Sequence, residues 1–203
     1  MPDVHVPDLG AHHAGGKSLL KIALEVLLIA VGVFLGLAGE QWRERAQHRE
    51  MAEESLRRFS SEIAVNRKSV AAVKEYHVTT QKSLSTYLAA EPQGRSKVNV
   101  NIHGLQPAFF EHTAWDLALV TQSLAYIEPS LAFSLSRIYT VQQEYDGLSH
   151  GILQAMYLRT PSENKDAFFS AVAIYYGDVV GIEPQLLAMY DEIGPRIDRA
   201  LGR

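Results

Sequence analysis

Cysteine is absent from the 203-residue chain, which excludes disulfide bonds, thiolate catalysis and cysteine-ligated zinc. The chain also has little net charge, because 19 Lys and Arg residues face 23 Asp and Glu residues and leave a formal charge of -4. A protein that binds duplex nucleic acid usually presents a basic surface, so nucleic acid is not an expected partner. No motif for a known reaction is present either. We therefore predict a protein that is not an enzyme and that holds no cofactor and no metal.

Glycine and proline are missing between Gly39 and Pro92, so nothing in this stretch stops a helix. Apolar residues recur there on alternating three- and four-residue steps, which predicts packing in a helical bundle or a coiled coil. The seam consists of Ala52, Leu56, Phe59, Ile63, Val70, Val73, Leu84 and Tyr87, with Asn66, His77 and Thr80 in the gaps.

Charge is nearly absent from the run Leu19–Gly39, which we interpret as one transmembrane helix. From Ile22 to Gly39 the chain has a single charged residue, and 18 residues at about 1.5 Å each span roughly 27 Å, close to the thickness of the hydrocarbon core. The run ends at the interfacial Trp42 without a cleavage site, so it predicts a retained anchor rather than a signal peptide. A buried helix of a soluble protein would need a polar stripe, and the run has none.

Two features of this run suggest interactions within the membrane. Glu25 is an acid inside the span; it either shares its charge with Lys21 one turn earlier or takes part in a proton or ion pathway. Gly32 and Gly36 form a GxxxG step, at which a second helix could approach closely and form a homodimer.

Several motifs together resemble a family of small single-span bacterial membrane proteins catalogued as a domain of unknown function. The shared features are Glu25 at the start of the apolar run, Gly32 within it, Gln41-Trp42-Arg43-Glu44 at its exit, and the later stretches Thr113–Asp116 and Ser123–Ile127. The chain departs from that family at Ala38-Gly39-Glu40, where the family usually has polar amides. The resemblance implies a helical domain anchored in the bacterial inner membrane, with no known activity.

Two arguments give different predictions for the side of the membrane on which the C-terminal part lies. Lys17 and Lys21 precede the span, whereas Arg43, Arg45 and Arg49 follow it, which favours a cytoplasmic C-terminus. The resemblance implies the reverse, because its members carry a basic N-terminal flank. We expect the second arrangement, with the C-terminal domain outside the cytoplasm.

The expected fold class is all-α: one N-terminal transmembrane helix continues into a long helix that packs in an antiparallel helical bundle. The expected regions are a disordered tail (1–16), the transmembrane anchor (17–41) and one helical bundle domain (42–203). Val98–His103 alternates apolar and polar residues, which indicates an extended connector that lies along the bundle.

Three later helices are expected. The first begins near Ala114 and turns Trp115, Leu119 and Leu124 inward. The second begins at Pro129, and its apolar stripe consists of Leu131, Leu135, Ile138, Tyr145 and Ile152. The third begins at Thr160-Pro161-Ser162-Glu163, a threonine cap followed by proline and glutamate, and we expect Pro184 and Gly194-Pro195 to break or kink it.

Four polar residues are candidates for an interaction site. Asn66 and His77 interrupt the apolar seam, where a polar residue either sets the register of the packing or belongs to a ligand pocket. His112, next to Glu111, could form half of a metal site or a general base with Asp116, or the three residues could simply cap a surface helix. We predict a scaffold or interaction module with a lipid bilayer and a membrane protein as partners; the alternative is a bundle that senses a small molecule.

Overall fold

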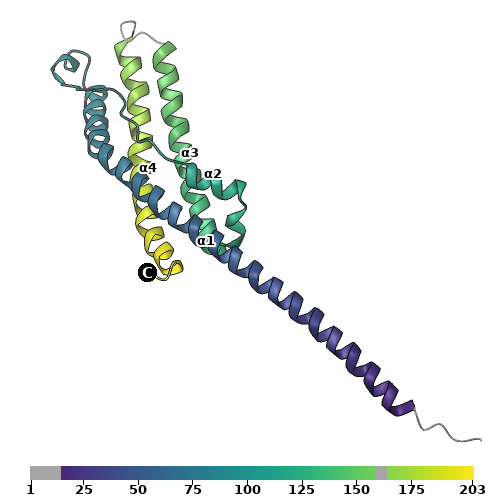
Figure 1. Ribbon diagram of the computed structural model, residues 1–203. Helices are drawn as coiled ribbons and strands as arrows, with labels where there is room; N and C mark the ends of the chain where they lie inside the picture. Colours follow the sequence, from purple (N-terminus) through teal and green to yellow (C-terminus); the bar gives the residue numbers. More distant parts are fainter. Residues whose placement is uncertain (1–14, 159–163) are drawn as a thin grey trace, which may run out of the picture. The chain divides into compact units, whose positions relative to one another are not determined.

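The computed structural model describes residues 15–158 and 164–203, with side chains from Lys21 onward, and the described chain is all-α as the sequence predicts (Figure 1). The described residues contain no strand. The helices are α1 (Gly15–Ala89), α2 (Thr113–Val120), α3 (Pro129–Leu158) and α4 (Lys165–Ala200), with short 3-10 helices η1 (Arg95–Lys97) and η2 (Ser123–Tyr126). Helix α1 begins at Gly15, two residues before the expected start of the anchor, and residues 1–14 lie outside the described part of the chain.

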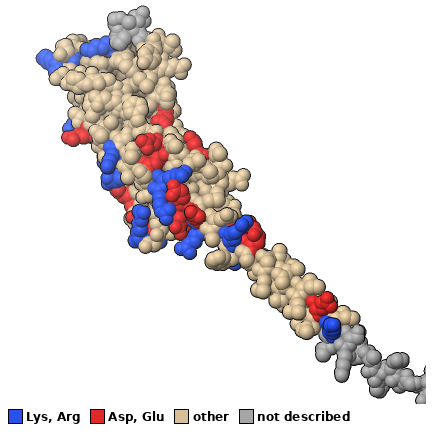
Figure 2. Space-filling model, viewed as in Figure 1, with Lys and Arg blue, Asp and Glu red and all other residues tan. Residues whose placement is uncertain are grey.

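The chain divides into two compact units, Met1–Gln47 and His48–Arg203, and helix α1 contributes to both. In the first unit every described side chain from Lys21 to Arg45 is exposed. An 18-residue window of α1 has a mean hydropathy of 2.5 with none of its residues buried, so α1 is long and apolar enough to cross a membrane. Figure 2 shows the N-terminal part of α1 as an uncharged surface with charged side chains at both of its ends.

The second unit is a bundle of three long helical segments, and pairs of contacts give their directions. Residues 48–89 of α1 run antiparallel to α4, because Tyr87 contacts Asp166 and His77 contacts Glu183. Helix α3 also runs antiparallel to α4, since Ser149 contacts Tyr175 near one end of the pair and Ser134 contacts Arg196 near the other (Figure 1). Both neighbours of α4 are therefore antiparallel to it, and the predicted antiparallel packing is confirmed.

The predicted seam of α1 is the face that it buries. All of the apolar residues on it are buried except Val73, which is partly buried against the core, and the polar residues in its gaps are buried as well. The outer face carries i,i+4 pairs, in which Arg57 donates to Glu53 and Arg58 donates to Glu54. A helix with one apolar seam and a charged outer face needs a neighbour along that seam, and α3 and α4 provide it.

A segment without regular secondary structure takes the place of a fourth helix in this bundle. We call residues 98–112 the connecting segment. It runs antiparallel to α1, because Gly104 bonds to Tyr76 and Glu111 bonds to Asn66. As the alternation predicts, Val100 and Ile102 pack on the core. One extended chain has no strand partner, so its backbone groups must find other hydrogen-bond partners.

The ends of the later helices agree only in part with the predictions. Helix α3 begins at Pro129 as expected, and the carboxylate of Glu128 accepts hydrogen bonds from the backbone N–H groups of Ser130 and Leu131. The expectation for Leu119 is wrong, because α2 ends at Val120 and buries Ala114 and Ala118 instead. In such a short helix these two small residues allow the close contact with the bundle.

Helix α4 corrects one part of a second prediction, that Pro184 or Gly194-Pro195 breaks the helix. It continues through Pro184 and Pro195 from Lys165 to Ala200, so neither proline breaks it. A proline within a helix removes one hydrogen bond, at a cost of about 3 kcal/mol, and burial of the apolar face on both sides offsets this loss. The predicted cap at Thr160–Glu163 lies outside the described residues. The described helix has Asn164 as its cap, whose side chain accepts a hydrogen bond from the backbone N–H of Ala167.

Candidate functional site

The polar residues that interrupt the seam of α1 bind the backbone of the connecting segment. Asn66 is fully buried, and its side-chain amide donates to the carbonyl oxygen of Glu111 at 2.9 Å while its Oδ1 accepts from the Glu111 N–H at 2.8 Å. The amide thus pairs with one residue of the segment as a neighbouring strand would. Asn66 is held in this role by two hydrogen bonds, which use its donor and its acceptor together.

Three more side chains of α1 extend this pairing along the segment. The hydroxyl of Ser69 accepts from the backbone N–H of Phe109 at 2.9 Å, and Tyr76 donates to the carbonyl of Gly104 at 2.7 Å. Glu62 accepts from the backbone N–H of Ala114, just beyond the segment, at 2.7 Å. Polar side chains of α1 therefore supply hydrogen-bond partners for backbone groups of a segment that has no strand neighbour.

His77 and Glu183 form a buried pair at the centre of this arrangement. His77 Nδ1 lies 2.5 Å from Glu183 Oε1, and both side chains are fully buried. On the other side of the ring, Nε2 lies 3.1 Å from the carbonyl oxygen of Leu105 and 3.0 Å from that of Gln106. Gln106 has a φ of 46°, a left-handed conformation that non-glycine residues rarely adopt, where the segment passes the imidazole.

The partners of the ring determine how many protons the pair holds. A backbone carbonyl cannot donate, so Nε2 carries a proton and donates it. The short contact between Nδ1 and Glu183 Oε1 then requires one further proton, which lies on the imidazole or on the carboxyl group. The pair has no net charge in either case. This neutrality removes most of the cost of burying two ionisable groups.

Buried tyrosines complete the environment of the pair. Tyr145 donates to Glu183 Oε1 at 3.2 Å and accepts from the backbone N–H of Ala108 at 3.0 Å, and Tyr176 donates to the carbonyl of Gly104 at 3.0 Å. Burial raises the pKa of Tyr145 and the pKa of Tyr176 well above the usual value for a phenol. Both hydroxyls therefore stay protonated and available as donors.

This network stabilises the fold rather than presenting a reaction centre. Its side chains form hydrogen bonds with the backbone and with one another. His77 and Glu183 are fully buried, so a substrate could not reach them unless the bundle opened. Two buried atoms among the described residues lack a partner, Glu183 Oε2 and Gln142 Oε1. An oxygen left without a donor makes the burial of Glu183 costly.

His112 is the N-cap residue of α2, and Asp116 lies in the first turn of that helix. His112 Nε2 lies 3.2 Å from Asp146 Oδ2 of α3, Glu111 is held through its backbone by Asn66, and Asp116 is exposed in the first turn of α2. Within residues 15–158 and 164–203 no group of three or more His, Cys, Asp or Glu side chains could hold a metal ion. His112 thus serves as a contact between the connecting segment and α3.

The remaining predicted residues belong to the first unit. Glu25, Gly32, Gly36 and Trp42 are all exposed on α1, and Trp42 is 76% exposed. A Cβ atom added at Gly32 or Gly36 would meet no atom within 4 Å. Nothing in the described chain occupies the surface around these glycines, so it is open to lipid or to another helix.

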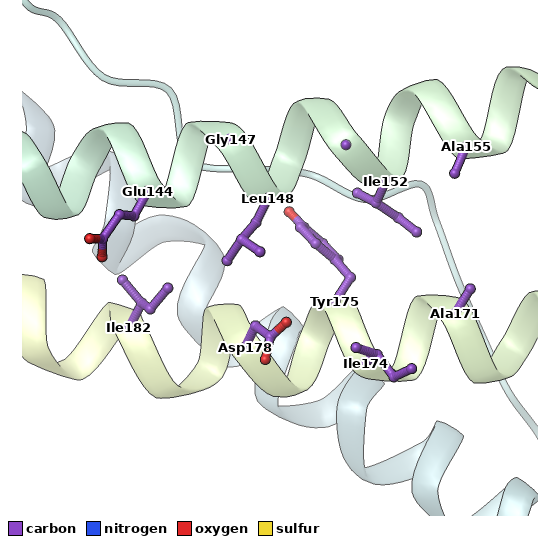
Figure 3. A pocket seen from close by; sticks show the side chains of 11 residues that line it. Glu144, Gly147, Leu148, Ile152, Ala155, Ala171, Ile174, Tyr175, Asp178 and Ile182 are labelled. Atoms are coloured by element: carbon purple, nitrogen blue, oxygen red, sulfur yellow. The ribbon is translucent and has the colours of Figure 1, made fainter.

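The sequence analysis missed an apolar groove between α3 and α4. It is open, has a volume of about 700 Å³ and includes Tyr175, whose hydroxyl bonds to Ser149. Figure 3 shows side chains of the two helices facing one another across it. Its described lining consists of Glu144, Gly147, Leu148, Gly151, Ile152 and Ala155 of α3 with Ala171, Ile174, Tyr175, Asp178 and Ile182 of α4. The sequence signal for it is the pair Gly147 and Gly151 inside an otherwise apolar helical stripe.

Comparison of the chain with protein-family models, with curated proteins and with solved structures found no match. The resemblance to single-span bacterial proteins therefore depends on the sequence motifs, and the assignment of a function depends on the chemistry of this chain.

Proposed function

We propose that this protein is a single-pass membrane protein whose second unit, His48–Arg203, acts as a non-enzymatic interaction module at the membrane surface. The observation that carries the proposal is the apolar stretch of α1, with its mean hydropathy of 2.5 and no buried residue. Apolar side chains that pack on nothing in their own chain require a nonaqueous environment.

The exposed side chains of the first unit support the membrane assignment. Leu28, Ile29 and Phe34 are between 62% and 69% exposed, and they lie on different sides of the helix. At roughly 25 cal/mol for each Å² of apolar surface, water is a poor surrounding for such a segment. A bilayer contacts a helix on all sides, which fits a segment that is apolar all round.

The resemblance to bacterial single-span proteins adds the inner membrane as the location and the extracytoplasmic side for the second unit. Gly32 and Gly36 add a means of association within the membrane, since their exposed backbone would allow a second α1 to approach. We assign interaction as the role of the second unit because the buried polar groups of its network support the fold. None of the groups in this network is an accessible reactive group.

Membrane fractionation tests the anchor directly. After ultracentrifugation of a detergent-free lysate, we expect the full chain in the pellet, resistant to alkaline carbonate and floating with lipid in a density gradient. Recovery of the folded chain from the supernatant would contradict the proposal. For topology, a C-terminal alkaline phosphatase fusion should be active, and activity of only a cytoplasmic reporter in the same position would place the second unit on the other side.

A second candidate function is recognition of a small molecule by the groove between α3 and α4. A volume of about 700 Å³ lies in the range of ligand sites, and the lining is mostly apolar. A screen of small molecules against the full chain in detergent would support this function if a compound raised the melting temperature by several degrees. Loss of that shift on changing Gly151 to Leu would locate the compound in the groove.

A further inference from the structure

No contact within the described chain explains why two residues of the α3–α4 groove are glycines. Gly147 and Gly151 lie inside helix α3, where each glycine costs about 1 kcal/mol relative to alanine. A Cβ atom added at either position would meet no atom within 4 Å, and neither residue has a positive φ. The lack of side chains at these two positions therefore leaves space for a group that does not belong to the described residues.

The side chains that line the groove indicate which kind of molecule could bind in this space. Its floor is formed by apolar side chains, among them Leu148 and Ile152, and Ile174 at its side is 67% exposed. Two acids, Glu144 and Asp178, also line it, and its described lining residues include no lysine or arginine. An apolar floor next to carboxylates suits an occupant that is apolar on one side and positively charged beside it.

The dimensions of the groove suit a helix. On α3 its lining extends from Glu144 to Ala155, which at 1.5 Å per residue is about 17 Å, or three helical turns. Glycines at positions i and i+4 form a flat strip on which the backbone of another helix can approach closely. A helix placed there would pack beside α3 and α4 as an additional helix, and no residue of the connecting segment lines the groove that it would fill.

We propose that the α3–α4 groove binds one amphipathic helix of a partner protein, whose apolar face packs on the glycine strip and whose lysine or arginine side chains pair with Glu144 and Asp178. This inference rests on the proposed role as an interaction module and names the chemistry of its partner. A second copy of the chain is the less suitable occupant, because a symmetric contact of two such grooves would bring four carboxylates into one interface.

A peptide selection tests the proposal. A phage-displayed library of helix-forming peptides of about 14 residues is selected against the full chain in nanodiscs of a zwitterionic lipid, and binders of empty nanodiscs are removed. We expect the selected peptides to share apolar residues at helical spacing flanked by Lys or Arg. Selection of acidic or nonhelical peptides, or of none, would overturn the proposal.

Two matched substitutions locate the binding. Gly151→Leu places a side chain in the groove, whereas Gly177→Leu places the same side chain on an exposed position of α4 that does not line it. A Cβ atom at either position meets no atom within 4 Å, and leucine favours helix over glycine, so both variants should fold. We expect Gly151→Leu to weaken the selected peptides about tenfold or more and Gly177→Leu to leave their affinity unchanged.

A change of charge gives an independent readout that leaves the shape of the groove intact. Asp178→Lys should weaken the basic peptides and strengthen analogues in which their Lys and Arg residues are replaced by Glu. Equal effects of the two glycine variants, or no effect of Asp178→Lys, would contradict the proposal. A dimer of the full chain that Gly151→Leu converts to a monomer would assign the groove to a second copy. Membrane fractionation is independent of these outcomes, so failure here would leave the anchor unaffected.

Discussion

The two halves of helix α1 show how one continuous helix can be suited to two surroundings. From Lys21 to Arg45 every side chain is exposed and most are apolar, whereas between His48 and Ala89 an apolar seam is buried and charged pairs cover the outer face. Secondary structure is the same in both halves. The two halves differ in the positions of their polar side chains. The side chains, and not the backbone, therefore decide which surroundings suit each half of the helix.

The polar residues of the two halves also differ in what they bind. Asn66 and His77 are buried in the second half, and every hydrogen bond that they make has a partner in the bundle. Glu25 and Trp42 in the first half are exposed. The buried polar residues of the second half thus hold the second unit together, whereas Glu25 and Trp42 of the first half contact the surroundings of the chain.

The largest effect is expected from charges placed in the first half. Val31→Arg together with Phe34→Arg should raise the free energy of membrane insertion by about 6 kcal/mol, because each arginine near the centre of a span costs about 3 kcal/mol. Fractionation should then find much of the chain outside the membrane pellet. As a control, Val65→Arg with Val78→Arg alters exposed valines of the second half and should leave the chain in the pellet. Equal behaviour of the two variants would show that the halves do not differ in surroundings.

Removal of Glu183 should give the next largest effect, now in the second half. Glu183→Leu leaves the buried Nδ1 of His77 without its partner, and we expect the free energy of unfolding to fall by about 3–5 kcal/mol. Denaturant unfolding of the full chain in detergent measures the change. Glu192→Leu, which alters an acid whose side chain is 73% exposed, should change stability little. If His77→Leu added to Glu183→Leu destabilised the chain by the sum of the two single effects, the two residues would not act as a pair.

A smaller loss is expected at Asn66. Asn66→Leu removes both hydrogen bonds to Glu111 and should lower the free energy of unfolding by about 1–3 kcal/mol. Hydrogen exchange should report faster exchange of the backbone N–H groups of residues 109–112. The control Asn99→Leu alters an exposed position of the connecting segment and should leave that exchange unchanged. Unchanged exchange in the Asn66 variant would mean that the segment is held by other contacts.

The smallest effect concerns alkaline pH. Burial and the hydrogen bond to Glu62 raise the pKa of Tyr139, so above about pH 10 the unfolded chain releases a proton that the folded chain retains. Stability therefore falls as pH rises, by roughly 1 kcal/mol per pH unit for this residue. Tyr139→Phe should reduce stability at neutral pH but make the alkaline decline shallower by that amount. An unchanged slope would contradict a protonated, buried phenol.

The sequence predicts most of the helical architecture because the relevant signals are local. The seam of α1 and the start of α3 at Pro129 follow from helical spacing and from the fixed φ of proline. The failures at Leu119 and Pro184 have a common cause. Whether a short helix buries its leucine, or a long helix tolerates a proline, depends on packing with elements that are distant in the sequence, and a local pattern does not contain that information.

The buried network and the groove were harder to predict for the same reason. The sequence singled out Asn66 and His77 because they interrupt a pattern, but it could not name Glu183, which lies 106 residues away from His77. The groove consists of positions on two helices, and each helix alone shows only small residues in an apolar stripe. A concave surface arises only when the helices are brought together.

The connecting segment has a consequence for the order in which the chain acquires its structure during synthesis. Tyr176 donates to the carbonyl oxygen of Gly104 and Glu183 contacts His77, and both residues belong to α4, which is synthesised after α1 and the connecting segment. Until α4 emerges, Gly104 lacks one of its donors and His77 lacks its carboxylate. While α4 is still being made, the connecting segment therefore has only part of the contacts that hold it in the folded bundle.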